Sequence, residues 1–129
     1  IEVKADGDWQ TMGRESLRQW LAAADACISG TEYAIAETGT IVLTVRPAQP
    51  RAVSLLPPLH IVLLHESQIV DNLASLVPQI KQDFVQAGEQ WRHSTLTFVT
   101  GPSRSADIEQ TLTLGVHGPV EVVVMVIRN

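Results

Sequence analysis

The residues best suited to chemistry lie in one short segment that follows a β-rich run, namely Gly101, Ser103, Arg104, Ser105 and Asp107. Gly101 and Pro102 should end that run, and the polar residues beyond them suit the start of a helix over 105–114. A helix N-terminus at the carboxyl end of a strand attracts anions, because its unpaired N–H groups and its dipole point outward. Arg104 would add a planar, permanent charge that matches a carboxylate or a phosphate. We therefore expect an anion site here, the alternative being a segment that only turns the chain and caps the helix.

A second group of candidate residues, Glu37, Thr38, Gly39 and Thr40, separates two extended runs. Glu37 could act as a catalytic or binding carboxylate beside two hydroxyl groups, and Gly39 would let a ligand approach the backbone. The same residues would also serve as the turn of a hairpin, which the local pattern alone favours.

The histidines give weaker signals. His60 and His65 are five residues apart on one predicted strand, so they face opposite sides and cannot share a metal ion. His65 falls at the carboxyl end of that strand and is a possible site residue. A helix over 105–114 would run back along the sheet for about 15 Å. It would place His117 at the amino end of the last strand, opposite the presumed ligand edge, where a C-cap turn or a subunit contact is the expected role.

Composition excludes several classes of function. A net charge of −5 argues against nucleic acid or an anionic membrane surface as a partner. With Cys27 as its single cysteine, the chain has no internal disulfide and cannot by itself hold an iron–sulfur cluster, which usually takes about four cysteines. One cysteine also fits a reducing, cytoplasmic compartment. The motifs of dinucleotide-binding, P-loop, zincin and serine hydrolase proteins are all absent from the sequence, and no apolar run approaches the length of a membrane span.

The elements that must position these residues follow from the apolar periodicity. Helical spacing covers about 14–26 and 71–87, where Pro78 should kink the second helix or start a new segment. Extended runs cover 27–29, 33–36, 40–45, 59–64, 95–100 and 120–127, and the last is almost wholly apolar, as in a buried strand. Helices that alternate with apolar strands predict an α/β sandwich whose parallel or mixed sheet is covered on both faces.

Three segments, in this order and spacing, resemble the LUD-domain family over about residues 26–127: AIAETGTIVL (34–43), RAVSLLPPLHIVLL (51–64) and TFVTGPSRSADIEQTLTLGVHGPVEV (97–122). The departures are small, with Ser105 standing where threonine is common and a short loop over 46–50. The resemblance implies a three-layer α/β/α sandwich with a mainly parallel sheet, similar to the NagB/RpiA/CoA-transferase group. It implies one LUD domain over 1–129, lacking an N-terminal segment of the full-length family members.

The resemblance also implies a role in oxidising L-lactate to pyruvate together with iron–sulfur partner proteins. This chain would be a non-redox subunit without a cofactor of its own, offering at most a carboxylate or anion site for a 2-hydroxy or 2-oxo acid. The family's motif positions fall on 37–40 and, beyond those, on Ser54, Gly101, Ser103, Arg104, Asp107, His117 and Gly118.

Two alternatives to this function stay open. By analogy with CoA transferases of this fold, which use a glutamate beside a glycine turn, the chain could be an independent enzyme. It would be CoA-transferase-like or sugar-phosphate-isomerase-like, with Glu37 as nucleophile or base and Arg104 holding an anion. We therefore expect Glu37 and Arg104 to line one cleft. The third reading is a purely structural assembly module.

Overall fold

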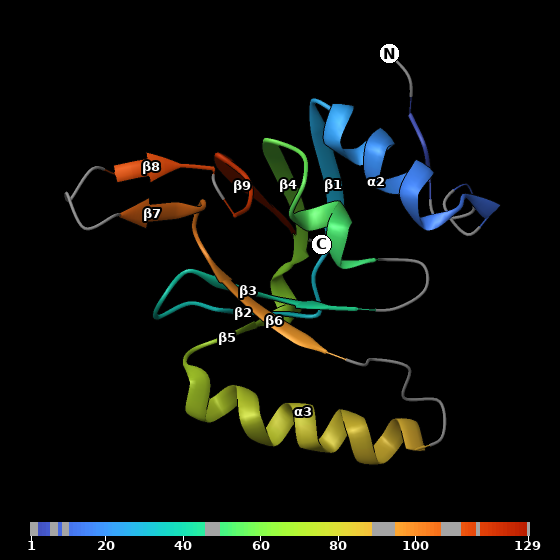
Figure 1. Cartoon of the computed structure of the whole chain (residues 1–129). Helices are drawn as coiled ribbons and strands as arrows, with labels where there is room; N and C mark the ends of the chain where they lie inside the picture. Colours follow the sequence, from blue (N-terminus) through green and yellow to red (C-terminus); the bar gives the residue numbers. More distant parts are fainter. Residues whose placement is uncertain are drawn as a thin grey trace.

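In the computed structural model, a mixed β-sheet and one helix pack on the same face of a parallel β-sheet, and a second helix covers the far face of the mixed sheet (Figure 1). The structure describes residues 3–5, 8, 11–45, 50–88, 95–106, 112–115 and 117–128. In this part of the chain, no helix has the length and apolar character needed to cross a membrane.

The first sheet is parallel, with strand order β1-β4-β9. Its strands are β1 (Ala26–Gly30), β4 (Leu59–His65) and β9 (Glu121–Ile127). The second sheet is mixed, with order β5-β2-β3-β6, and only its β2–β5 pair is parallel. Its strands are β2 (Tyr33–Ile35), β3 (Thr40–Thr44), β5 (Ile69–Val70) and β6 (Leu96–Thr100).

Of the helices in the described residues, one packs on the face of the parallel sheet that also meets the mixed sheet, and the other packs on the far face of the mixed sheet. They are α2 (Arg14–Ala23) and α3 (Leu73–Ala87), with two short 3-10 turns, η1 (Arg51–Ser54) and η2 (Glu66–Gln68). Asn72 caps α3 by accepting a hydrogen bond from the Ser75 N–H, and the helix continues through Pro78 as one element. The predicted α/β class and parallel sheet are confirmed, and a second, mixed sheet packs on the parallel one.

The core has three clusters that hold these layers together. Ile41 and Leu43 of β3 pack against Val62 and Leu64 of β4, which joins the two sheets. The opposite side of the mixed sheet packs on α3 through Leu76, a fully buried residue. The third cluster joins α2 to the parallel sheet and η1 and consists of Leu21, Cys27 and Val53.

The predicted helix over 105–114 is wrong. Arg104–Ala106 forms β7 and Leu112–Leu114 forms β8, an antiparallel pair with Arg104 opposite Leu114. The physical reason is local, since threonine and leucine alternate over 111–114 of the sequence, and β-branched threonine favours a strand more than a helix. The antiparallel pairing also brings Leu114 back beside Arg104, whereas a helix would separate the two residues along its length.

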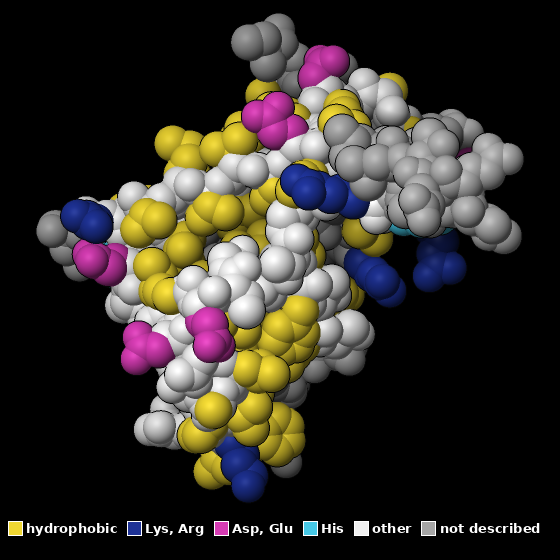
Figure 2. Space-filling view, turned by 90° about the vertical axis from the view of Figure 1, so that its left-hand side faces the viewer, with side chains coloured by type: hydrophobic (Ala, Val, Ile, Leu, Met, Phe, Trp, Pro, Cys, Tyr) yellow, Lys and Arg dark blue, Asp and Glu magenta, His cyan; other side chains and the backbone are white. Residues whose placement is uncertain are grey.

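The expectation that 120–127 is covered on both faces is also wrong. Within the part of the chain that the structure describes, β9 is an edge strand that pairs with β4 alone, and most of its side chains are exposed. Figure 2, which views the molecule from the left of Figure 1, shows a wide area of hydrophobic side chains on this side. An apolar run in the sequence therefore does not show whether another layer covers the strand.

A histidine lies at the centre of the parallel sheet, packed away from solvent. His60 is 0 % exposed, and its Nε2 lies 2.8 Å from the hydroxyl oxygen of Ser29, which is also buried. Its Nδ1 has no hydrogen-bond partner among the described residues. Burial lowers the pKa of His60 below its ordinary value of 6.5, so the folded protein holds a neutral imidazole.

The neutral His60 makes stability depend on pH. Because its pKa is lower in the folded than in the unfolded chain, its contribution is fully present above about pH 6.5. As pH falls from there toward the folded-state pKa, the unfolded chain takes up the proton, and the free energy of unfolding drops by up to about 1.4 kcal/mol per pH unit. We expect His60→Gln to flatten this dependence in urea titrations between pH 6.5 and 5.

The matched control for this experiment is His117→Gln, because the His117 side chain is exposed. It should keep the slope of the unmodified protein. Equal slopes for the His60→Gln variant and the unmodified protein would contradict the prediction.

Candidate functional site

The turn that carries Glu37 joins β2 to β3, as the hairpin interpretation predicts. Gly39 has a φ of +64°, a conformation that other residues rarely adopt. The Glu37 N–H donates a hydrogen bond to the Asp71 carbonyl at 3.0 Å, which fixes the turn beside the start of α3. The side chain of Glu37 is exposed and free to meet a ligand.

A chain of three threonine hydroxyl groups crosses the end of the mixed sheet beside this turn. The Thr38 Oγ1 lies 2.6 Å from the Thr40 Oγ1, which lies 2.8 Å from the Thr100 Oγ1. Three hydroxyl groups carry three protons, and the two hydrogen bonds between them use two. When both bonds run in the same direction, one end of this row of hydroxyl groups keeps a proton to donate, and the other end offers lone pairs.

These groups line a hollow of about 300 Å³ on the side of the mixed sheet that faces α3. The residues that line it are Ile35, Glu37, Thr38, Thr40, Leu73, Phe98 and Thr100. Leu73 is the first residue of α3, so the positive end of that helix dipole lies beside the hollow. The hollow thus combines a hydroxyl donor, a carboxylate and an apolar wall.

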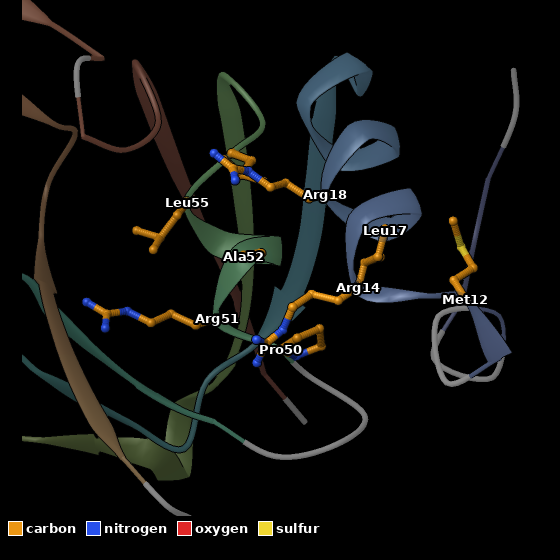
Figure 3. Close-up of a pocket in the computed structure, with 9 residues that line it drawn as sticks. Met12, Arg14, Leu17, Arg18, Pro50, Arg51, Ala52 and Leu55 are labelled. Atoms are coloured by element: carbon orange, nitrogen blue, oxygen red, sulfur yellow. The ribbon is translucent and has the colours of Figure 1, made fainter.

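A larger hollow of about 570 Å³ lies between α2 and η1. Arg14, Arg18 and Arg51 are among the residues that line it, together with apolar side chains. In Figure 3 the three guanidinium groups end at separate points, so they do not converge on one small anion. None of the predicted site residues that the structure describes is among those that line this hollow.

The predicted anion segment is held by backbone bonds and does not begin a helix. Gly101 turns the chain with a φ of +76°. The Ser103 N–H donates to the Pro119 carbonyl at 2.8 Å, and the Ser103 carbonyl accepts from the Gly115 N–H at 3.1 Å. These bonds occupy the Ser103 N–H, one of the backbone N–H groups that the sequence predicts to face a ligand. Arg104 is exposed at the start of β7 and is not among the described residues that line the hollow with Glu37.

The placement of His117 opposite this segment is wrong. Its N–H donates to the Ser103 Oγ at 3.3 Å, because the β7–β8 hairpin brings the chain back to Ser103. Gly118 packs on the same serine, so a Cβ there would lie 3.4 Å from the Ser103 Cβ. Ser103, His117 and Gly118 therefore share one turn cluster.

The remaining predicted residues that the structure describes take part in turns or strands. The ring of His65 accepts from the Ser67 N–H and caps η2, and the hydroxyl of Ser54 donates to the Arg51 carbonyl within η1. The backbone of Ser105 belongs to β7, while Asp107 lies outside the described residues. Burial raises the pKa of the Cys27 thiol to about 11, so it stays protonated at neutral pH.

Four residues of the hollow were missed from the sequence: Ile35, Leu73, Phe98 and Thr100. The alternation of Phe98 and Thr100 along β6 could have placed these two on one face. Their approach to Glu37 depends on the pairing of β3 with β6, which sets Thr40 opposite Thr100. Local sequence does not specify that pairing.

Comparisons with known proteins agree with this fold. The sequence model of the LUD domain matches residues 2–127. The chain belongs to the LUD domain family. A crystal structure of a DUF162 family protein from Deinococcus radiodurans is similar, with a TM-score of 0.58 and 31% sequence identity over 87% of this chain and 58% of that chain.

Several curated relatives of this LUD chain are named lactate utilization protein C. The one from Bacillus pumilus is 41% identical over 77% of this chain and 40% of its own length. The one from Halalkalibacterium halodurans is 34% identical over 94% of this chain and 52% of its own length. The chain thus spans about half the length of the curated relatives it matches.

The hydroxyl chain in the hollow gives a testable contribution to stability. Thr40 is only 5 % exposed and bonds both neighbours, so Thr40→Val keeps the shape and removes the central oxygen. Thr38 and Thr100 reach solvent, so both can bond water when the Thr40 oxygen is removed, and the cost stays small. We expect the free energy of unfolding to fall by about 0.5–1.5 kcal/mol. Urea titration measures it, with Thr38→Val at the exposed end as the control. A Thr40→Val protein as stable as the unmodified one would show that the three linked hydroxyl groups do not stabilise the fold.

Proposed function

We propose that this LUD chain acts in lactate utilisation and that the hollow beside Glu37 binds a small 2-hydroxy or 2-oxo acid. The observation that carries the proposal is the chain of Thr38, Thr40 and Thr100 hydroxyls next to a carboxylate and an apolar wall. The names of the relatives give the metabolic context.

The groups of lactate find matching groups in the hollow. A threonine hydroxyl at one end of the row of three hydroxyl groups donates to the lactate carboxylate. The positive end of the α3 dipole favours the negative charge of that carboxylate. A carboxyl oxygen of Glu37 accepts from the 2-hydroxyl group, and the methyl group faces Leu73 and Phe98. Pyruvate keeps the carboxylate and methyl contacts and loses the bond to Glu37, so lactate binds more tightly.

The oxidation of lactate to pyruvate removes two electrons and two protons, and an acceptor must take them. With one cysteine, this chain cannot hold an iron–sulfur cluster on its own. We propose that iron–sulfur partner proteins, in the cytoplasm, receive the electrons. The role of this chain is then to bind the acid and the partners.

The binding step is tested by titrating the purified chain with L-lactate in a calorimeter. A hydrogen bond to a charged group contributes about 1.5–3 kcal/mol, so Thr100→Val should weaken lactate binding by roughly 10- to 150-fold. The matched control is Thr97→Val on the same strand, since alternation places Thr97 on the opposite face of the sheet. Equal affinities for the Thr100→Val and Thr97→Val variants, or no lactate binding at all, would overturn the proposed site.

The role with partners is tested separately, by L-lactate-dependent reduction of an artificial dye. We expect no reduction by this chain alone and reduction after the iron–sulfur proteins are added, with a complex recovered by size-exclusion chromatography. Dye reduction by this chain alone at the rate of the assembled system would rule out the non-redox role. Product formed by this chain from an acyl-CoA or a sugar phosphate, and lost in Glu37→Gln, would favour an independent enzyme instead.

A further inference from the structure

In the described part of the chain, the hollow between α2 and η1 is lined by side chains of two kinds. Arg14, Arg18 and Arg51 contribute guanidinium groups, and the other described side chains that line it are apolar. A guanidinium group donates hydrogen bonds and accepts none, so this lining offers positive charge, donors and apolar contact. We call this site the arginine hollow. Its chemistry fits an occupant that carries negative groups on an apolar body.

The three guanidinium groups are not neutralised within the described part of the chain. None of them forms an ion pair with a described carboxylate. Arg14 and Arg18 lie one turn apart on α2, where like charges repel each other. Arg14 is also the first residue of α2, at the positive end of the helix dipole. An occupant with negative groups would offset these unfavourable placements, because it supplies the opposite charge.

The positive charges are spread along the arginine hollow. In Figure 3, Arg14 and Arg18 extend from α2 toward the segment over 50–55, whereas Arg51 extends from η1 on the side away from α2. One turn of α2 places Arg14 and Arg18 about 6 Å apart along the helix axis. Alternate side chains of an extended peptide lie about 6.6 Å apart on one edge. Carboxylates at every second position of such a peptide therefore match the spacing of these two arginines.

The arginine hollow is wide and shallow. Its volume is about 570 Å³, yet each described residue that lines it is at least partly exposed, and Leu56 is 37 % exposed. A small-molecule site encloses about 70–90 % of the surface of its ligand. A shallow surface hollow suits a protein segment better, because the peptide groups of the segment stay on the open side and bond water. Binding of acidic segments by arginine clusters is a recurring mode of peptide recognition.

We propose that the arginine hollow binds an extended segment of a partner protein in which acidic and apolar side chains alternate. The carboxylates on one edge of the segment pair with Arg14 and Arg18, and the apolar side chains on the other edge lie against Leu55 and Leu56. Because the chain has a net charge of −5, the rest of its surface repels an acidic partner, which directs the encounter to this hollow. The proposal is independent of acid binding beside Glu37, since the two hollows share no described residue.

The test is fluorescence anisotropy of the purified chain with a short labelled peptide that alternates glutamate and leucine. We expect saturable binding that weakens as salt is added. Arg18→Gln should weaken it by roughly 10- to 150-fold, as expected when a hydrogen bond between charged groups is lost. Arg51→Gln, on η1, is an independent second variant that should also weaken binding. Lys81→Gln is the matched control, because it removes the same charge from α3, on the far face of the mixed sheet, and should leave the affinity unchanged.

A second peptide separates the proposed site from general charge attraction. With serine in place of leucine, the peptide keeps its charge and loses the contact with Leu55 and Leu56, so it should bind about tenfold more weakly. Equal affinities of the two peptides, or of the Arg18→Gln and Lys81→Gln variants for the first peptide, would overturn the proposal. So would tighter binding of glutarate than of the peptide, abolished in Arg18→Gln, because the hollow would then be a small-molecule site.

Discussion

The structure depends on the burial of β3 on both of its faces. All five of its residues, Thr40–Thr44, are buried, and it lies between β2 and β6 in the mixed sheet. Ile41 and Leu43 fill the interface with the parallel sheet, while Val42 packs in the cluster with Leu76 of α3. A shift of one residue in its pairing would exchange these two sets of side chains, because successive residues point to opposite faces. The strand therefore fixes the position of both sheets and of α3.

The candidate site follows from the same constraint. Thr40 is the first residue of β3 and points to the α3 side, so the register that buries Val42 also sets the Thr40 hydroxyl against Thr100. The turn before it is held to the start of α3 by the bond from Glu37 to Asp71. A polar group at the end of a fully packed strand has little freedom to move. The hollow is thus preorganised by its scaffold, which lowers the entropy lost when a small ligand binds.

Much of this arrangement could be predicted from the sequence, and the failures have physical causes. Apolar periodicity located α2 and α3, and the Glu37–Thr40 turn was identified as a hairpin. The capping residues after Gly101 predict a helix, whereas the alternation of leucine and threonine over Leu112–Leu114 fits the strand that forms there. The helix prediction also misplaced His117, since the end of a helix and the end of a hairpin lie at opposite edges. Thr100 and Phe98 could not be assigned to the site, because their approach to Glu37 depends on strand pairing far apart in the sequence.

The outer side of the parallel sheet and the hollow beside Glu37 lie on opposite sides of the stacked sheets. The hollow faces α3, and the outer side is the exposed face of β1, β4 and β9. A change on that outer side can reach the hollow only through the cluster between the sheets, where Val62 and Leu64 contact Ile41 and Leu43. Because packed interiors deform little, such a change would leave the hydroxyl chain in place. Substitutions on the outer side of the parallel sheet and substitutions in the hollow should therefore have separable effects.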